Sequence, residues 1–215
     1  MKNPSLSAIT AKEAVQRRVS RETFERMEAY EALLIKWQRS INLISKASIS
    51  DIWNRHILDS LQLTDHAPED PNFWVDLGSG AGLPGLICAV ALTEKSPQTE
   101  FTLIEVDQRK CVFLAEASRA LGISVNIVRQ RIEDVDSLQA DVVSARALAP
   151  LDLLCSYASR HLSPGGICLF LKGKSLQDEV DQADKSWRMQ RELIASRSDP
   201  EGVIVRIKDL QHAGN

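Results

Sequence analysis

The chain has 215 residues, of which 44% are hydrophobic and 26% are charged, and its net charge at neutral pH is -3. This length fits one α/β domain with a sizeable core, or one domain with an appendage, and the composition is that of an ordinary soluble globular protein. The charge excludes a generally basic nucleic-acid-binding surface, and no run of about 18 apolar residues is present that could cross a bilayer.

The first 66 residues are predicted to form a helical extension. Residues 1–18 contain no apolar segment of the signal-peptide type, so we expect a cytoplasmic protein. Apolar side chains recur at helical spacing in residues 20–39, and a second helix is expected over residues 49–64, capped by Ser48 with Asp51 three residues on. Two prolines then break the helical pattern. The predicted division is therefore 1–66 and 67–215, and the ten Lys/Arg against eight Asp/Glu of the first part permit an RNA-facing patch without demonstrating one.

From residue 73 onward the hydrophobic pattern alternates between strand and helix. Such alternation predicts an α/β fold with a doubly wound, mostly parallel sheet. The tail differs, because two strand-like segments joined by a short polar connection predict an antiparallel hairpin at the sheet edge. The expected strands are 73–77, 101–106, 125–129, 141–145, 167–171, 189–196 and 203–208, and the expected helices are 84–92, 109–121 and 151–162.

Metal and redox chemistry have no support in the sequence. The cysteines are far apart in apolar stretches, where they are expected to act as small buried hydrophobic residues, and no Cys-x-x-Cys pair is present. The histidines lack ligand spacing, so no metal site is expected. The residues concerned are Cys88, Cys111, Cys155, Cys168, His56, His66, His161 and His212.

The most informative segment is residues 72–92, NFWVDLGSGAGLPGLICAVAL. An apolar strand is followed by Gly78, Gly80 and Gly82, and then by an apolar helix opened by Pro84. Glycine lets the chain turn through positive φ and bring bare backbone N–H groups against a ligand. A tight turn without a ligand is the alternative. The second strand and Glu105 complete a βαβ unit, which favours a nucleotide-binding loop.

Two cofactors compete for this loop. Residues 80–85 satisfy the dinucleotide pattern Gly-x-Gly-x-x-Gly, and Glu105 lies 20 residues after Gly85, as expected for an acid that binds ribose. Read from Val75, the same segment resembles the first motif of S-adenosylmethionine-dependent methyltransferases, with Asp76 two residues before the first glycine. An acid there suits a sulfonium and an α-amino group but repels a pyrophosphate. We therefore favour S-adenosylmethionine (AdoMet) over NAD.

Longer segments carry a closer resemblance. They are residues 42–63, VDLGSGAGLPGL, TLIEVDQRKCVFL, VRQRIEDV, SARALAPL and LKGKS, and in this order the chain resembles the ribosomal RNA small subunit methyltransferase G family, also called glucose-inhibited division protein B, over roughly residues 25–210. The resemblance implies a class I AdoMet-dependent methyltransferase domain at 67–215 that methylates guanine N7 in 16S ribosomal RNA. The implied partner is 16S rRNA or an assembling small ribosomal subunit, with no membrane and no metal, and the protein is expected to be a monomer.

The resemblance also implies the cofactor-binding residues. It places the cofactor against Gly78, Gly80, Leu83, Glu105, Ile132, Glu133 and Arg146. Glu105 can accept hydrogen bonds from both ribose hydroxyls, Ile132 can lie on the adenine face, and Glu133 can close that edge of the pocket. Ala140 stands where the family usually has an aromatic residue, which affects packing rather than activity.

Several of these residues have structural alternatives. Glu105 could cap the next helix, and Glu133 could belong to a solvated acidic turn. Arg146 lies in an apolar segment, so it is either the partner of a buried charge or a ligand residue. His56 is interpreted as a hydrogen-bonded structural histidine rather than a catalyst. Two lysines near the end of a strand, Lys172 and Lys174, could contact phosphates or could be ordinary exposed side chains.

The implied chemistry needs no general base, so no catalytic residue is assigned. Guanine N7 carries a lone pair and no proton, and alignment with the sulfonium methyl suffices. The chain lacks the Asn/Asp-Pro-Pro-Tyr/Phe motif of exocyclic amino methylation and the Pro-Cys or Thr-Cys nucleophile of pyrimidine C5 methylation. A small-molecule methyltransferase and a non-catalytic AdoMet- and RNA-binding module remain open alternatives.

Overall fold

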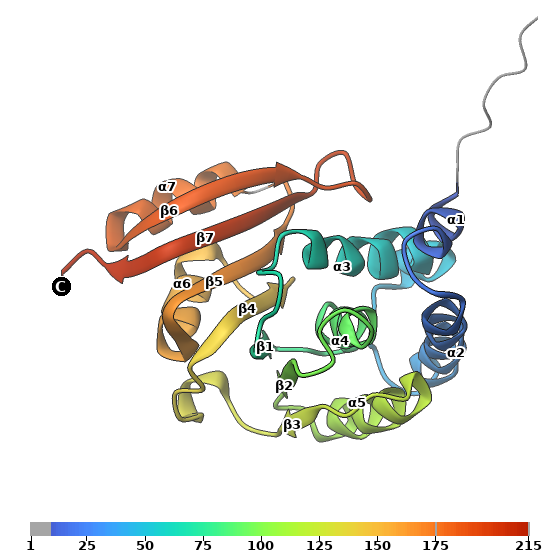
Figure 1. Ribbon diagram of the computed structural model, residues 1–215. Helices are drawn as coiled ribbons and strands as arrows, with labels where there is room; N and C mark the ends of the chain where they lie inside the picture. Colours follow the sequence, from blue (N-terminus) through green and yellow to red (C-terminus); the bar gives the residue numbers. More distant parts are fainter. Residues whose placement is uncertain (1–9, 175, 215) are drawn as a thin grey trace, which may run out of the picture.

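The computed structural model describes residues 10–174 and 176–214. In these residues seven strands form one sheet in the order β3-β2-β1-β4-β5-β7-β6 (Figure 1). The first five strands pair in parallel, and β7 pairs antiparallel with both β5 and β6. The predicted mostly parallel sheet with an antiparallel edge hairpin is confirmed. The strands are β1 (Phe73–Leu77), β2 (Glu100–Ile104), β3 (Asn126–Val128), β4 (Ala140–Arg146), β5 (Leu162–Lys172), β6 (Trp187–Ala195) and β7 (Val203–His212).

Helices cover both faces of the sheet. On one face, α4 (Gly85–Leu92) and α5 (Gln108–Leu121) pack together with the N-terminal helices, and on the other lie α6 (Leu151–His161) and α7 (Leu176–Ser186). The sequence interpretation missed α7, although the buried side chains Leu176, Val180 and Ala183 recur at helical spacing. Strand order reverses between β1 and β4. In open α/β sheets, ligands bind beyond the carboxyl ends of the strands at such a reversal.

The N-terminal region is helical, as predicted, but its second helix is irregular. The expected helix over residues 20–39 is α2 (Arg21–Gln38), capped by the hydroxyl of Ser20, and a short α1 (Ala11–Gln16) precedes it. The prediction of one continuous helix over residues 49–64 is wrong. That segment consists of the 3₁₀ turn η1 (Lys46–Asp51), the π-helical η2 (Trp53–Leu58), the single turn α3 (Asp59–Leu61) and the 3₁₀ turn η3 (Gln62–Asp65).

The prediction that Ser48 caps this helix is also wrong, for a physical reason. Ser48 lies inside η1, and its hydroxyl is 2.8 Å from Nε2 of His56, so it serves a tertiary contact rather than the backbone N–H groups of a first turn. The residue at the helix start, Ser45, makes no side-chain capping bond. The π-helical turn places the His56 side chain inward, where it is 7% exposed.

The N-terminal helices share a hydrophobic cluster with α4 and α5. The phenol of Tyr30 on α2 is buried and donates a hydrogen bond to the carbonyl oxygen of Ala81, at 2.7 Å. The N-terminal region therefore supports the glycine-rich segment directly. In the residues that the structure describes, the N-terminal region and the rest of the chain share this hydrophobic cluster. The division into 1–66 and 67–215 stays a prediction.

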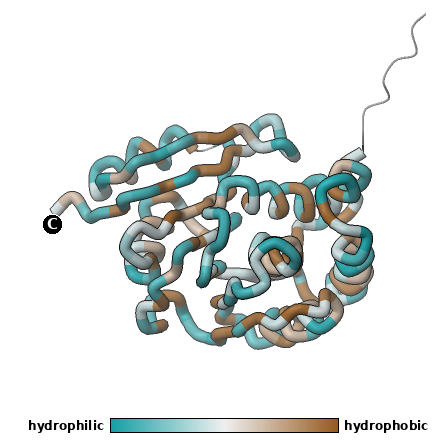
Figure 2. The backbone as a smooth tube through the Cα atoms, in the orientation of Figure 1, coloured by the Kyte–Doolittle hydropathy of each residue, from teal (hydrophilic) through white to brown (hydrophobic). Residues whose placement is uncertain are grey.

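The distribution of polarity agrees with this architecture. Figure 2 shows a largely hydrophilic hairpin of β6 and β7 with hydrophobic residues interspersed, as expected at a half-exposed sheet edge. Three of the four cysteines, Cys88, Cys155 and Cys168, are buried as expected, whereas Cys111 is only half-buried in the first turn of α5. Within residues 10–174 and 176–214, no helix is long and apolar enough to cross a membrane, and no group of three metal-ligating side chains is found.

Candidate functional site

The glycine loop connects β1 to α4. All three glycines that the sequence singles out have positive φ, +61° at Gly78, +56° at Gly80 and +77° at Gly82, a conformation that other residues rarely adopt. A Cβ on Gly78 would lie 2.5 Å from a methyl carbon of Leu148, so Leu148 packs directly over the bare backbone. The loop therefore requires glycine for its turn and for the close approach of a neighbour.

Glu105 follows β2 and links the glycine loop to the next helix. Its carboxylate accepts the N–H of Gly80 at Oε2, at 2.9 Å, and the N–H of Asp107 at Oε1, at 2.8 Å. The helix cap itself is Asp107, which accepts from two N–H groups of α5. Glu105 is thus fixed by two backbone donors, and a carboxylate keeps further lone pairs for a ligand on each oxygen.

A cavity of about 320 Å³ lies beside these residues and is called here the glycine-loop cavity. Its volume falls at the lower end of the range of about 300–1,000 Å³ typical of small-molecule sites. The ends of four strands, β1, β2, β3 and β4, contribute to it. The lining residues are Gly78, Ile104, Glu105, Val106, Lys110, Gln130, Arg131, Ile132, Glu133, Ala147 and Leu148.

The structure brings four of the seven expected cofactor residues together in the glycine-loop cavity: Gly78, Glu105, Ile132 and Glu133. Ile132 is 8% exposed and offers an apolar wall. Glu133 accepts from its own backbone N–H and from Arg131, at 2.6 Å, and these contacts lower the pKa of its carboxyl group. The Glu133 side chain is therefore expected to be ionised at neutral pH.

The other three expected residues lie elsewhere. Gly80 acts through its N–H on Glu105, and Leu83 is 4% exposed in the hydrophobic cluster beneath the loop. Arg146 projects into a neighbouring cavity. The assignment of all seven residues to the cofactor stays a prediction.

Asp76, the residue that favours AdoMet over NAD in the sequence, is fully buried. It lines neither the glycine-loop cavity nor the neighbouring cavity that contains Arg146. It accepts a hydrogen bond from the hydroxyl of Ser144 at 2.7 Å and one from the N–H of Gly85 at 3.2 Å. Burial raises the pKa of its carboxyl group to about 6, although these hydrogen bonds oppose the shift. Asp76 therefore holds the start of α4 against β4, below the loop. The Gly-x-Gly-x-x-Gly match is likewise structural at its third glycine, because a Cβ on Gly85 would lie 2.8 Å from the Asp76 carboxylate.

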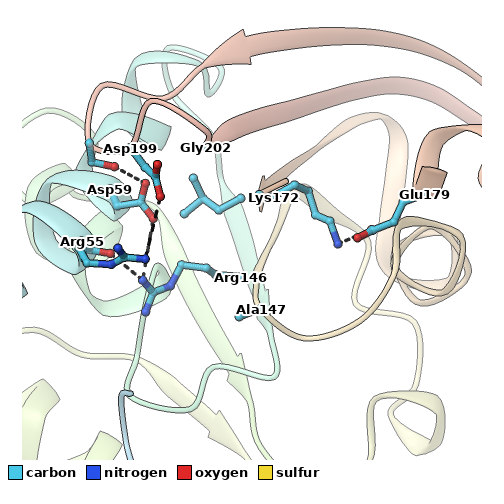
Figure 3. Close-up of a pocket in the computed structure, with 11 residues that line it drawn as sticks. Arg55, Asp59, Arg146, Ala147, Lys172, Glu179, Asp199 and Gly202 are labelled. Carbon is cyan, nitrogen blue, oxygen red and sulfur yellow. Dashed lines mark hydrogen bonds and ion pairs between the residues drawn. The ribbon is translucent and has the colours of Figure 1, made fainter. Parts of the chain in front are cut away.

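A second cavity of about 240 Å³, called here the Arg146 cavity, shares one lining residue with the first. Figure 3 shows the residues that line it. Ala147 lines both cavities and has a positive φ of +51°. The walls come from η2, α3, the ends of β4 and β5, α7 and the turn between β6 and β7. The lining residues are Arg55, Asp59, Arg146, Ala147, Leu171, Lys172, Gly173, Glu179, Ser198, Asp199 and Gly202.

Arg146 is held by a network on the η2 side of its cavity. One guanidinium nitrogen donates to the carbonyl oxygen of Arg55 at 3.0 Å and contacts Nδ1 of His56 at 2.7 Å. Burial, followed by the charges of Arg146 and Arg55, lowers the pKa of His56 to about 3, so the ring is neutral at physiological pH. It accepts from Arg146 and donates to Ser48. His56 is therefore a hydrogen-bonded structural histidine, as predicted.

Asp59 faces Arg146 across the same cavity. Its Oδ2 lies 3.9 Å from the guanidinium, while Oδ1 accepts from the hydroxyls of Ser198 and Ser196 at 2.5 and 3.3 Å and from the amide of Gln62 at 3.0 Å. Arg146 thus has the ion-pair partner that its apolar sequence context requires.

The two lysines have different surroundings. Lys172 is 10% exposed, pairs with Glu179 at 2.5 Å and donates to the carbonyl oxygen of Ala149, so it is fixed in the cavity wall. Lys174 is 76% exposed and pairs with Glu201 at 2.7 Å, as an ordinary surface lysine does.

Sequence reasoning missed several lining residues. Gln130, Ala147 and Leu148 follow the ends of β3 and β4, and the rule that ligands bind beyond the carboxyl ends of parallel strands could have found them. Ser198 and Asp199 lie in the turn of the edge hairpin. No local signal connects that turn with Asp59.

Comparisons with known proteins agree with this geometry. A family model described as rRNA small subunit methyltransferase G matches residues 23–198. A ribosomal RNA small subunit methyltransferase G from Parvibaculum lavamentivorans is 49% identical, over 89% of this chain and 85% of its own, and one from Ruegeria pomeroyi is 47% identical, over 88% and 92%.

Among solved structures, a putative class I S-adenosylmethionine-dependent methyltransferase from Listeria monocytogenes superposes with a TM-score of 0.58. The two chains are 14% identical, and the match covers 91% of this chain and 72% of the other. This likeness shows the fold. The family resemblance of the sequence is thus confirmed by the family model and by close relatives.

Proposed function

The chain belongs to the rRNA small subunit methyltransferase G family, and on that premise we propose that it transfers the methyl group of AdoMet to N7 of a guanine in 16S ribosomal RNA. The observation that carries the proposal is the pair of cavities that meet at Ala147, beyond the carboxyl ends of the central strands. One has the features of a nucleoside-binding site, and the other is lined by partly buried charged side chains. Two reactants could therefore be held side by side.

The residues of the glycine-loop cavity fit AdoMet. Gly78 lines the cavity without a side chain, Ile132 offers an apolar face for adenine, and Glu105 can accept the ribose hydroxyls. AdoMet supplies an electrophilic methyl group on a sulfonium. The charge of Glu133 is paired with Arg131, whereas the carboxylate of Glu105 is held by backbone N–H groups and suits a cationic ligand better than a pyrophosphate.

The reaction requires no proton transfer by the protein. The lone pair of N7 forms the new N–C bond, the S–C bond breaks, and its electron pair returns to sulfur, which leaves a neutral thioether. No histidine or cysteine is found among the described residues that line either cavity. What the protein contributes is alignment, exclusion of water and a preorganised field.

We propose further that the protein works in the cytoplasm as a monomer on 16S rRNA or on the assembling small subunit. Sedimentation velocity of the free protein tests the monomer, and a single species at twice the chain mass would contradict it. Base extrusion costs a few kcal/mol less when the base is already poorly stacked, so a looped guanine is expected to be the better substrate.

One experiment tests the activity. Radiolabelled AdoMet is incubated with the protein and with unmethylated 16S RNA or small subunits, and 7-methylguanine is mapped by strand cleavage at the modified base. Label at one guanine N7 is the expected result. Label confined to small molecules would support a small-molecule methyltransferase. Saturable AdoMet binding without transfer to any RNA would support a non-catalytic module.

A further inference from the structure

The Arg146 cavity and the glycine-loop cavity share one lining residue. Ala147 lines both, and the peptide geometry there is unusual for a residue with a side chain, with φ at +51°. Groups bound in the two cavities would therefore both lie beside Ala147. The Arg146 cavity, of about 240 Å³, lies below the range of about 300–1,000 Å³ that whole ligands occupy, so it suits a fragment such as a single base.

Within this cavity, Asp59 has one committed and one available oxygen. Oδ1 accepts three hydrogen bonds, from Ser198, Ser196 and Gln62. For Oδ2, the contact recorded among the described residues is the guanidinium of Arg146 at 3.9 Å, beyond hydrogen-bonding distance. The carboxylate is thus fixed through one oxygen, while the other retains its capacity to accept hydrogen bonds (Figure 3).

We propose that the Arg146 cavity receives the target guanine and that Asp59 accepts hydrogen bonds from its N1–H and N2–H groups. This proposal rests on the proposed methylation of guanine N7. N7 lies on the far side of the purine from the N2 amino group, so a guanine held by Asp59 can direct N7 toward Ala147 and the glycine-loop cavity. Adenine has neither an N1–H nor an N2 amino group, which makes Asp59 a residue that determines specificity.

The same contact favours the reaction. As N7 gains the methyl group, positive charge grows on the purine, and its N1–H and N2–H groups become stronger donors. A carboxylate that accepts from them interacts more strongly with the transition state than with the bound substrate, which lowers the barrier. Burial raises the pKa of Asp59, but the hydrogen bond from Ser198 and the charge of Arg146 act in the opposite direction and favour its ionised form.

The test uses RNAs that differ only at the target guanine, once that guanine has been mapped. Guanosine is replaced there by inosine, which lacks the N2 amino group, or by 7-deazaguanosine, which lacks N7. The ratio of kcat/KM for guanosine to that for inosine is measured for the wild type, for Asp59→Asn and for Asp199→Asn. Asp199 is the matched control, because it is an acid of the same cavity whose Oδ2 lies 4.0 Å from Arg55.

The wild type and Asp199→Asn are expected to prefer guanosine by about tenfold or more, which is the effect of losing one hydrogen bond to a charged group. Asp59→Asn should methylate guanosine more slowly, with a ratio near one and unchanged AdoMet affinity. A wild-type ratio in Asp59→Asn would overturn the proposal. A ratio near one for the wild-type protein would also overturn the proposal. This result does not depend on whether Asp59→Asn folds.

The 7-deazaguanosine RNA separates this inference from the proposed function. No methylation of it is expected by any variant. Methylation of that RNA would contradict N7 as the acceptor, whereas the inosine ratios judge Asp59 alone.

Discussion

The two cavities at the carboxyl edge of the sheet differ in how the chain builds them. The glycine-loop cavity takes its residues from the ends of β1, β2, β3 and β4, each within a few residues of a strand terminus. The Arg146 cavity joins Arg55 and Asp59 to Ser198 and Asp199, about 140 residues later in the chain. The first is a local consequence of the βαβ pattern, and the second exists only in the folded protein.

Their electrostatics differ as well. In the glycine-loop cavity, Glu105 is fixed by backbone N–H groups of a loop and a helix start. In the Arg146 cavity, charged side chains lie in pairs, Arg146 at 3.9 Å from Asp59 and Lys172 at 2.5 Å from Glu179. Substitutions in the first cavity should therefore act on AdoMet binding, and those in the second on methyl transfer.

Gly78→Val is expected to have the largest effect. Its Cβ would meet Leu148 at 2.5 Å in a backbone conformation that costs a branched residue about 1–2 kcal/mol, so AdoMet affinity should fall by about 100-fold or more. Calorimetry with AdoMet measures it. The control is Gly165→Val, because Gly165 also has positive φ, +83°, but nothing lies within 4 Å of its added Cβ. Equal AdoMet affinity in the two folded variants would mean that the glycine loop is only a turn.

Arg146→Lys should lower methyl transfer by roughly 30-fold, which corresponds to about 2 kcal/mol. Lysine keeps the charge but lacks the fork that reaches the Arg55 carbonyl and His56 together. AdoMet affinity, measured by calorimetry, should stay within about threefold of the wild type, because Arg146 faces the neighbouring cavity. A loss of AdoMet affinity as large as the loss of transfer would instead support Arg146 as a cofactor ligand.

Glu105→Gln should weaken AdoMet by about tenfold, since an amide offers one acceptor oxygen and must place an NH₂ group against the N–H of Gly80 or Asp107. Deoxyribose analogues of AdoMet identify the contact. The wild type should lose more affinity than the variant when the ribose hydroxyls are removed. Equal losses would show that Glu105 does not hold them.

His56→Gln is expected to have the smallest effect, on stability against pH. The folded-state pKa of His56, about 3, is below the unfolded value of about 6.5, so the unfolded chain binds the proton first and stability falls as pH drops through this interval. At about pH 5 the loss amounts to roughly 2 kcal/mol. Glutamine supplies a hydrogen-bond acceptor and a donor but does not titrate. The variant should therefore lose less of its free energy of unfolding than the wild type as the pH falls to about 5.

Urea unfolding at about pH 7.5 and pH 5 measures this difference between the two proteins. Asp76, whose pKa is raised to about 6, acts in the opposite direction, because its folded state favours the proton and gains stability as pH falls. That contribution is common to both proteins and cancels in the comparison. Parallel losses of stability in wild type and variant would contradict the assigned pKa of His56.

The sequence predicts most of the sheet because its signals are local. Alternating apolar segments, the glycines at Gly78, Gly80 and Gly82, and the acid at Glu105 follow from positions close together in the chain, and the structure places Glu105 against the loop. The burial of Asp76 could not be predicted from the sequence. Its hydrogen-bond partner Ser144 lies on β4, and β4 becomes the neighbour of β1 only through the strand order of the folded sheet. The same holds for Asp59 and Ser198.

The helix over residues 49–64 fails for a related reason. Helical spacing indicates that the segment is helical, but it does not distinguish α from 3₁₀ and π turns. That choice is made by the contacts of His56 with Ser48 and Arg146, one of which lies 90 residues away. Tertiary contacts therefore override local propensity where the second cavity is built.

The most direct test of the two-cavity account is a crystal structure of the protein with S-adenosylhomocysteine and 7-methylguanosine monophosphate. The account predicts the adenosyl group between Ile132 and Glu105, the purine in the Arg146 cavity with its N1 and N2 on Oδ2 of Asp59, and the sulfur and the N7 methyl facing one another past Ala147. A purine bound outside the Arg146 cavity, or an adenosyl group inside it, would contradict the account.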